Sequence, residues 1–212
     1  MSKPARAVIS DFGGVLTNPL IEAFAAYQEH SGVRFEDLGR AMQAATEARG
    51  GEHPLFLLEK GLISEAEFLH RLEEHLPEGT RLEGFRDTYF EALHPNAELI
   101  AFMRELRDRG LRMAMLTNNV REWEPHWRSK LPDIDDIFEL VVDSAFVGMR
   151  KPEPEIYHLT LERMGGGLTP EDCVFLDDLE PNVEAARALG MRAVRYQSNA
   201  QAIPEIEQAL RA

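Results

Sequence analysis

Cysteine and long apolar stretches are both scarce in this sequence. The 212 residues include one cysteine, Cys173, so no internal disulfide can form. It lies in the apolar run 173–176, where burial is expected rather than reactivity. No run approaches the roughly 20 apolar residues that span a bilayer, and residues 1–9 hold no apolar stretch long enough for a signal peptide. We therefore expect a reducing, cytoplasmic setting and no membrane segment.

Positive charge is also in short supply. Lys and Arg total 23 against 37 Asp and Glu, which leaves a formal net charge of −14. Nucleic-acid binders draw affinity from basic side chains that neutralise phosphates, and anionic membrane surfaces attract the same side chains. The charge balance thus argues against both as partners. With 44% hydrophobic residues the chain can build a sizeable core, and its length predicts one domain, with or without a smaller insert.

Short apolar runs that end in polar residues alternate with helical patterns, which is typical of a parallel α/β sheet. Five runs are expected to form strands: 7–9, 112–116, 140–142, 173–176 and 193–194. One buried helix face is indicated by Leu99, Phe102, Met103 and Leu106, and Gly110 supplies its stop. Residues 181–189, closed by Gly190, predict another helix.

Residues 18–93 show helical patterns and no convincing buried strand. Ser64 and Glu67 have the spacing of a capping box at a helix start. Gly50, Gly51 and Gly61 divide the region into separate helices. We therefore predict a helical insert over 18–93 within a catalytic core formed by 1–17 and 94–212.

Polar side chains stand where the apolar runs end. In an open parallel sheet the ligand sits beyond the carboxyl ends of the strands, so these residues are the first candidates for a site. They are Asp11, Thr117 and Asn118, Lys151 in the segment 148–154, and Asp177 and Asp178 with Asn182 nearby.

The segments that carry these residues look, in this order, like the four motifs of the haloacid dehalogenase-like superfamily. The resemblance covers nearly the whole chain. Segments 147–157 and 175–182 look most like the branch that contains the N-terminal phosphatase domain of soluble epoxide hydrolase and small bacterial sugar-phosphate phosphatases. The resemblance implies a Rossmann-like three-layer parallel sheet core. It also implies that the helical insert is a cap that closes over the site.

The resemblance implies that Asp11 is a nucleophile. Attack of its carboxylate on phosphorus gives an aspartyl-phosphate that water later hydrolyses. Three carboxylates that converge at strand ends would repel one another without a cation. Because Mg²⁺ prefers oxygen ligands, we expect Asp11, Asp178 and the backbone carbonyl of Gly13 to bind it.

The remaining residues receive supporting roles. Lys151 is expected to neutralise the charge on Asp11 and on the transferring phosphoryl group, while Thr117 and Asn118 donate hydrogen bonds to its oxygens. Neighbouring strand residues point to opposite sides, so Asp177 and Asp178 are not expected to be equivalent ligands. We expect Asp177 and Asn182 to orient Lys151, a metal-bound water or the loop after the fourth strand.

One position departs from the family pattern. The phosphatase motif usually has a second Asp two positions after the nucleophile, which acts as general acid and then as base, and this chain has Gly13 there. Proton transfer by a positioned side chain is worth about 10² to 10⁴ in rate. Three outcomes are open. Another group, an ordered water or the substrate supplies the proton; the leaving group needs little protonation; or the protein binds phosphorylated ligands with little turnover. His53 in the insert is one candidate donor.

The leading interpretation is a Mg²⁺-dependent phosphatase of a small phosphorylated metabolite, such as a sugar phosphate, that acts through Asp11. One alternative is a haloacid dehalogenase, whose halide leaves without protonation. The other is a low-activity protein that binds phosphorylated metabolites. The expected partner is the small metabolite, with no nucleic acid and no membrane, and a homodimer is compatible with the sequence.

Overall fold

A five-stranded sheet forms the centre of the computed structural model, which describes residues 3–211. Its order is β3-β2-β1-β4-β5, and every neighbouring pair is parallel. The strands are β1 (Ala7–Ser10), β2 (Arg112–Thr117), β3 (Leu140–Asp143), β4 (Cys173–Asp177) and β5 (Arg192–Arg195). The chain adds strands outward from β1 on one side and then returns to add β4 and β5 on the other. Strand order therefore reverses between β1 and β4, which is where a sheet of this kind opens a crevice for a ligand.

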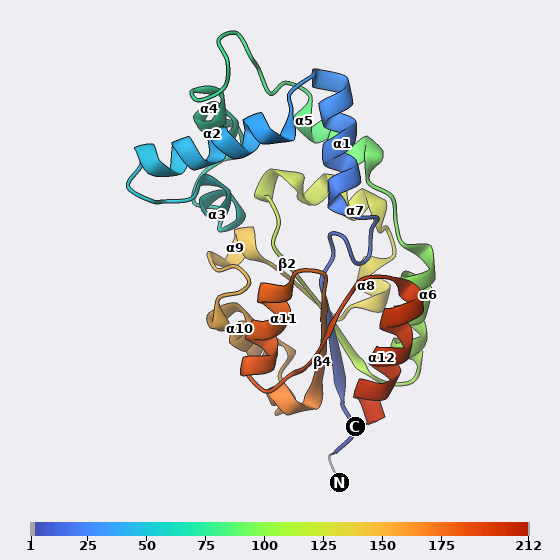
Figure 1. The fold of residues 1–212 in the computed structure, drawn as a ribbon. Coiled ribbons are helices and arrows are strands. Elements are labelled where there is room, and N and C mark those ends of the chain that lie inside the picture. The colour runs from blue at the N-terminus through green and yellow to red at the C-terminus, as the bar shows by residue number, and fades with distance from the viewer. Residues whose placement is uncertain (1–2, 212) are drawn as a thin grey trace.

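Helices cover both faces of the sheet. On one side lie α6 (Ala97–Asp108), α8 (Ile134–Ile137) and α12 (Asn199–Arg211), and on the other lie α10 (Pro154–Met164) and α11 (Glu180–Ala188) (Figure 1). Successive strand residues point to opposite faces. Val8 and Met113 accordingly belong to one apolar core, and Ile9 and Ala114 belong to the other. The predicted Rossmann-like three-layer arrangement is confirmed.

Residues 18–93, here called the cap, form five helices. They are α1 (Leu20–Ser31), α2 (Phe35–Ala48), α3 (Pro54–Glu59), α4 (Glu65–Glu73) and α5 (Phe85–Ala92). They lie beyond the carboxyl ends of the strands, at the opposite end of the molecule from the start of β1 (Figure 1). The two linkers that join the cap to the sheet run side by side, because Thr17 bridges Pro95 and the Asn18 N–H donates to the His94 carbonyl at 2.9 Å.

Further short helical segments lie in the connections between these elements. They are η1 (Arg121–Trp123), α7 (Glu124–Lys130), α9 (Ser144–Val147) and η2 (Pro170–Asp172). At the start of α4 the predicted capping box is formed by half. The Ser64 hydroxyl accepts the Glu67 N–H at 3.1 Å, but the Glu67 carboxylate pairs with Arg71 at 2.7 Å. The stronger charged partner has drawn the glutamate away from the helix start.

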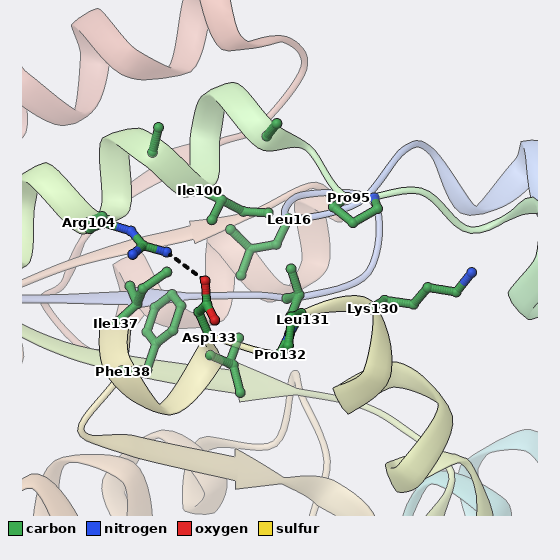
Figure 2. A pocket seen from close by; sticks show the side chains of 13 residues that line it. Leu16, Pro95, Ile100, Arg104, Lys130, Leu131, Pro132, Asp133, Ile137 and Phe138 are labelled. Atoms are coloured by element: carbon green, nitrogen blue, oxygen red, sulfur yellow. Dashed lines mark hydrogen bonds and ion pairs between the residues drawn. The ribbon is translucent and has the colours of Figure 1, made fainter.

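An apolar pocket of about 280 Å³ lies between α6 and the segment 130–138. Figure 2 shows Ile100, Leu131, Ile137 and Phe138 around it and an ion pair between Arg104 and Asp133. None of the predicted site residues lines this pocket. The predicted active site therefore lies outside this pocket. Among residues 3–211, no helix combines the length and the apolar character that crossing a membrane would require.

Candidate active site

Asp11 stands at the carboxyl end of β1, beside the point where strand order reverses. Its N–H continues the ladder to β4 by donating to the Leu176 carbonyl at 2.8 Å, which sets the direction of its side chain. The carboxyl group is buried, and its Oδ1 accepts a hydrogen bond from the Lys151 ammonium at 2.7 Å. Oδ2 accepts no hydrogen bond from any residue that the structure describes. One oxygen is thus held while the other remains available to a ligand.

Lys151 reaches this point from the segment that precedes α10. Its side chain is only 1% exposed, and Nζ also contacts Asp177 Oδ2 at 2.6 Å. A buried ammonium needs such partners because an unpaired charge is costly in the interior. The two carboxylates fix the ammonium between the ends of β1 and β4.

Asn118 holds the Lys151 backbone on two sides. Its Oδ1 accepts the Lys151 N–H at 2.8 Å, and its Nδ2 donates to the Lys151 carbonyl at 2.9 Å. The structure therefore gives the Asn118 side chain a contact that the sequence does not predict, and one of its two amide hydrogens stays free for the predicted phosphate contact. Thr117 ends β2 and is buried. Within residues 3–211 its hydroxyl has no protein hydrogen-bond partner, so it can donate to a ligand.

Asp177 has every carboxylate oxygen occupied by protein donors. Oδ1 accepts the Leu179 N–H and Asn182 Nδ2, each at 2.9 Å, while Oδ2 accepts from Lys151. The Asn182 carbonyl in turn accepts the Tyr157 hydroxyl at 3.0 Å. Tyr157 is fully buried on α10, and nothing in its spacing along the sequence predicts that it meets α11. These contacts suit Asp177 and Asn182 to positioning rather than to direct metal binding.

Asp178 is the carboxylate without a cationic partner among the described residues. Asp11, Asp177 and Asp178 each offer an oxygen within 4.8 Å of the others. Since Asp177 is saturated, the free oxygens belong to Asp11 and Asp178. The Gly13 carbonyl lies on the same loop as Asp11 and accepts no hydrogen bond from residues 3–211. An all-oxygen donor set of this kind fits Mg²⁺.

The charges at the site also favour a bound cation. Burial raises the pKa of the Asp11 carboxyl to about 7; Lys151 opposes that rise, while Asp177 and Asp178 add to it. Burial and the Asp177 charge likewise raise the pKa of Asp178. Burial alone would lower the pKa of Lys151, but Asp11 and Asp177 raise it above its ordinary value. One ammonium does not offset three acids, and a divalent cation would favour their ionised forms.

The cap touches the segment that carries Lys151. Arg150 Nε pairs with Glu59 Oε2 at 2.5 Å, and both side chains are nearly buried. The Arg150 guanidinium also lies over the Phe56 ring, 3.9 Å from its centre. Lys60 pairs with Glu153 at 2.5 Å. Sequence reasoning missed these contacts, because their only signal is charge on a helix whose orientation it does not determine.

His53 lies at the start of α3, beside this contact. It stacks on Phe56 with ring centres 4.3 Å apart, and its buried Nδ1 has no hydrogen-bond partner among the described residues. Burial and the Arg150 charge lower the pKa of His53. The shift favours the neutral imidazole. Its role as a proton donor stays a prediction.

Comparison with known proteins gives a family and several relatives. The family described as haloacid dehalogenase-like hydrolase matches residues 5–190. The chain is 30% identical to the sesquiterpene phosphatase astK of Aspergillus oryzae over 88% of this chain and 87% of that protein. It is also 30% identical to acyl-CoA dehydrogenase family member 10 of Mus musculus, where 97% of this chain matches 19% of the relative. The chain thus spans about a fifth of that mouse protein.

One solved structure adds a comparison of folds. It is a HAD family enzyme from Bacteroides thetaiotaomicron in complex with magnesium and inorganic phosphate. The TM-score is 0.67 at 22% identity, over 92% of this chain and 96% of that one. At this identity the likeness concerns the fold.

Proposed function

Because the chain belongs to the haloacid dehalogenase-like hydrolases, we propose that it is a Mg²⁺-dependent phosphatase of a small phosphorylated metabolite, with Asp11 as the nucleophile. The observation that carries the proposal is the arrangement around Asp11. Its Oδ1 is held by Lys151 and its Oδ2 is free, beside the acids Asp177 and Asp178. A nucleophilic carboxylate needs one oxygen oriented and the other exposed to the reacting atom.

The reaction begins with attack of Asp11 Oδ2 on phosphorus. An O–P bond forms as the P–O bond to the leaving group breaks, and the leaving oxygen keeps the electron pair. Lys151 offsets the charge of the phosphoryl group, and the Thr117 hydroxyl donates a hydrogen bond to it. Water then hydrolyses the aspartyl-phosphate, which releases phosphate and restores Asp11.

The metal ion would be held by Asp178, by the Gly13 carbonyl and by the Asp11 oxygen that does not attack phosphorus. Bound Mg²⁺ supplies charge stabilisation for the phosphoryl oxygens. Asp177, through its contact with Lys151, keeps the ammonium directed at Asp11. The relative astK is named a phosphatase, and the neighbour from Bacteroides thetaiotaomicron is a complex with magnesium and inorganic phosphate. Both names support the proposal of a Mg²⁺-dependent phosphatase.

The dehalogenase alternative accounts for less of the site. A halide leaves without protonation, so the absence of an acid at Gly13 suits that reaction. However, the cluster of Asp11, Asp177 and Asp178 serves a cation and a phosphate, and has little use in displacing halide from carbon. A binding protein with low turnover is supported by Gly13 alone. A phosphatase that favours good leaving groups accounts both for Gly13 and for the cluster of Asp11, Asp177 and Asp178.

A substrate screen tests this proposal. Purified protein with Mg²⁺ would be assayed against sugar phosphates, acyl phosphates, terpenyl phosphates, nucleotides and a 2-haloacid, with D11N as the matched variant. We expect phosphate release that EDTA stops and Mg²⁺ restores, and at least a 100-fold loss in D11N, on the scale of losing a nucleophile. Unchanged turnover in D11N, or halide release insensitive to EDTA, would show the proposal to be wrong.

A further inference from the structure

The backbone conformation does not require glycine at position 13. Gly14 adopts φ of +77°, in the region that favours glycine, but Gly13 does not lie in that region. Space is the tighter constraint. A Cβ on Gly13 would stand 3.1 Å from Leu20 Cδ1 and 3.3 Å from Leu20 Cδ2, closer than ordinary van der Waals contact. Even a Cβ at this position requires the end of the Leu20 side chain to move by a few tenths of an ångström.

Leu20 is held in this place by the linker that enters the cap. It is the first residue of α1, three positions after the Thr17–Pro95 bridge. The Thr17 hydroxyl accepts the Gly14 N–H at 2.9 Å, so the linker is also tied to the nucleophile loop. Leu20 itself is partly buried against the main apolar core. The cap thus sets an apolar side chain directly against the loop that carries Asp11.

Tyr89 extends the same kind of surface from α5. Its ring lies 5.6 Å from Phe24, 5.2 Å from Phe90 and 4.9 Å from Trp123, centre to centre. Burial, followed by the Asp11 charge, raises the pKa of the Tyr89 hydroxyl. The Asp11 charge therefore acts on the Tyr89 hydroxyl. With its raised pKa, this hydroxyl is a much weaker proton donor at neutral pH than a carboxylic acid.

We propose that Leu20 is a specificity-determining residue that occupies the volume a proton donor at position 13 would need. It thereby confines the enzyme to leaving groups that depart with little protonation, and this inference rests on the phosphatase function proposed above. As Asp11 Oδ2 bonds to phosphorus and the ester P–O bond breaks, the leaving oxygen keeps the electron pair and takes its proton from water. A carboxylic acid at position 13 would donate that proton directly.

A set of variants tests the pairing of Gly13 with Leu20. G13D, L20A, G13D/L20A and G13N/L20A would be compared with the native protein on phosphate esters of graded leaving-group pKa. We expect G13D/L20A to raise kcat/KM for poor leaving groups at least 10-fold, within the range for a positioned acid, and to flatten the dependence on leaving-group pKa. L20A should keep the steep dependence of the native protein. G13N/L20A, which has the shape of the acid variant without its proton, should gain nothing.

Two results would overturn the inference. An equal gain in G13D alone would mean that Leu20 is no barrier, and no gain in a folded G13D/L20A would mean that an acid at position 13 is not what the site lacks. Circular dichroism and thermal melting establish folding, and G13A, which adds only the Cβ, measures the cost of crowding Leu20. Failure of the phosphatase function itself would appear separately, as turnover that survives D11N in the native background.

Discussion

At the scale of single residues, the buried contact between Lys151 and its two carboxylates is the feature on which the proposed chemistry depends. Lys151 is held by Asp11 and by Asp177, and of these two only Asp177 has its other oxygen bound by further protein groups. This division leaves Asp11 free to react while Asp177 stays in place. Asn182 serves the same end one contact further away.

Substitution of Asp177 should therefore lower turnover without removing the nucleophile. We expect D177N to reduce kcat about 10- to 100-fold, on the scale found for residues that orient a site, and N182A to reduce it less. D172N is the matched control. Asp172 is also buried and also meets cations, Lys3 and Arg6, but lies at the other end of β4. Comparable loss of kcat in D172N and D177N would contradict the positioning role.

Asp143 gives a prediction about pH and stability. Burial, with a smaller contribution from Glu124, raises the pKa of this carboxyl to about 6 from 3.8. Between these values the unfolded chain binds fewer protons than the folded one, so the stability of the native protein falls as pH rises through the window. The free energy of unfolding of D143N minus that of the native protein should increase by about 2 kcal/mol from about pH 4 to about pH 7. Urea titrations at both pH values measure it, and a difference independent of pH would contradict the assignment.

At the scale of elements, the strands and the sheet edge could be predicted and the meeting of cap and core could not. An apolar run that ends at a polar residue predicts each buried strand, and parallel strands bring those ends together. Asp11 and Asp177 are found in this way. Glu59 and Arg150 are not, because their pairing depends on how α3 is turned toward the sheet, and that is decided by packing across the whole cap. The position of Leu20 against Gly13 could not be predicted for the same reason.

The cap rests on the core through the turn between α3 and α4. Gly61 there has φ of +65°, and a Cβ on it would stand 2.2 Å from the Ala145 carbonyl oxygen. Gly79 also has a left-handed φ, +84°, but its Cβ would meet nothing within 4 Å. Because both share the backbone strain and only Gly61 contacts the core, the pair separates the two effects.

G61A should accordingly be more damaging than G79A. Both lose about 1 kcal/mol of stability through the left-handed backbone, and we expect G61A to lose a further 1–3 kcal/mol or so as the cap is pushed from α9. KM should rise in G61A and stay near the native value in G79A. Denaturant unfolding and steady-state kinetics on both variants give the comparison. Equal behaviour would mean that the turn does not hold the cap.

At the scale of the whole molecule, a chain with a net charge of −14 is proposed to handle anionic phosphates. The site resolves this conflict locally. Lys151 is buried at the carboxyl ends of the strands, and one oxygen each of Asp11 and Asp178 can bind a cation there. The acidic exterior is then a matter for solubility and partner choice, while the local charge governs the substrate.

Metal binding should be visible in global stability, independently of turnover. A ligand that binds only the folded state stabilises it by about 2.7 kcal/mol at a hundred times its Kd. We expect Mg²⁺ to raise the Tm of the native protein and to raise that of D178N far less. D87N, at an exposed carboxylate on α5, should keep the native response. A full Mg²⁺ response in D178N would remove Asp178 from the ligand set.

The central claim is that phosphate passes through Asp11, and trapping the intermediate tests it most directly. Residues 7–34 lie between Arg6 and the cleavage site after Arg34, and Asp11 is the one aspartate among them. Protein quenched in acid during turnover with Mg²⁺ should yield this tryptic peptide with the added mass of one phosphoryl group, lost on treatment with hydroxylamine and absent in D11N. Sustained phosphate release with no phosphoryl group on this peptide, or an unchanged adduct in D11N, would contradict the account.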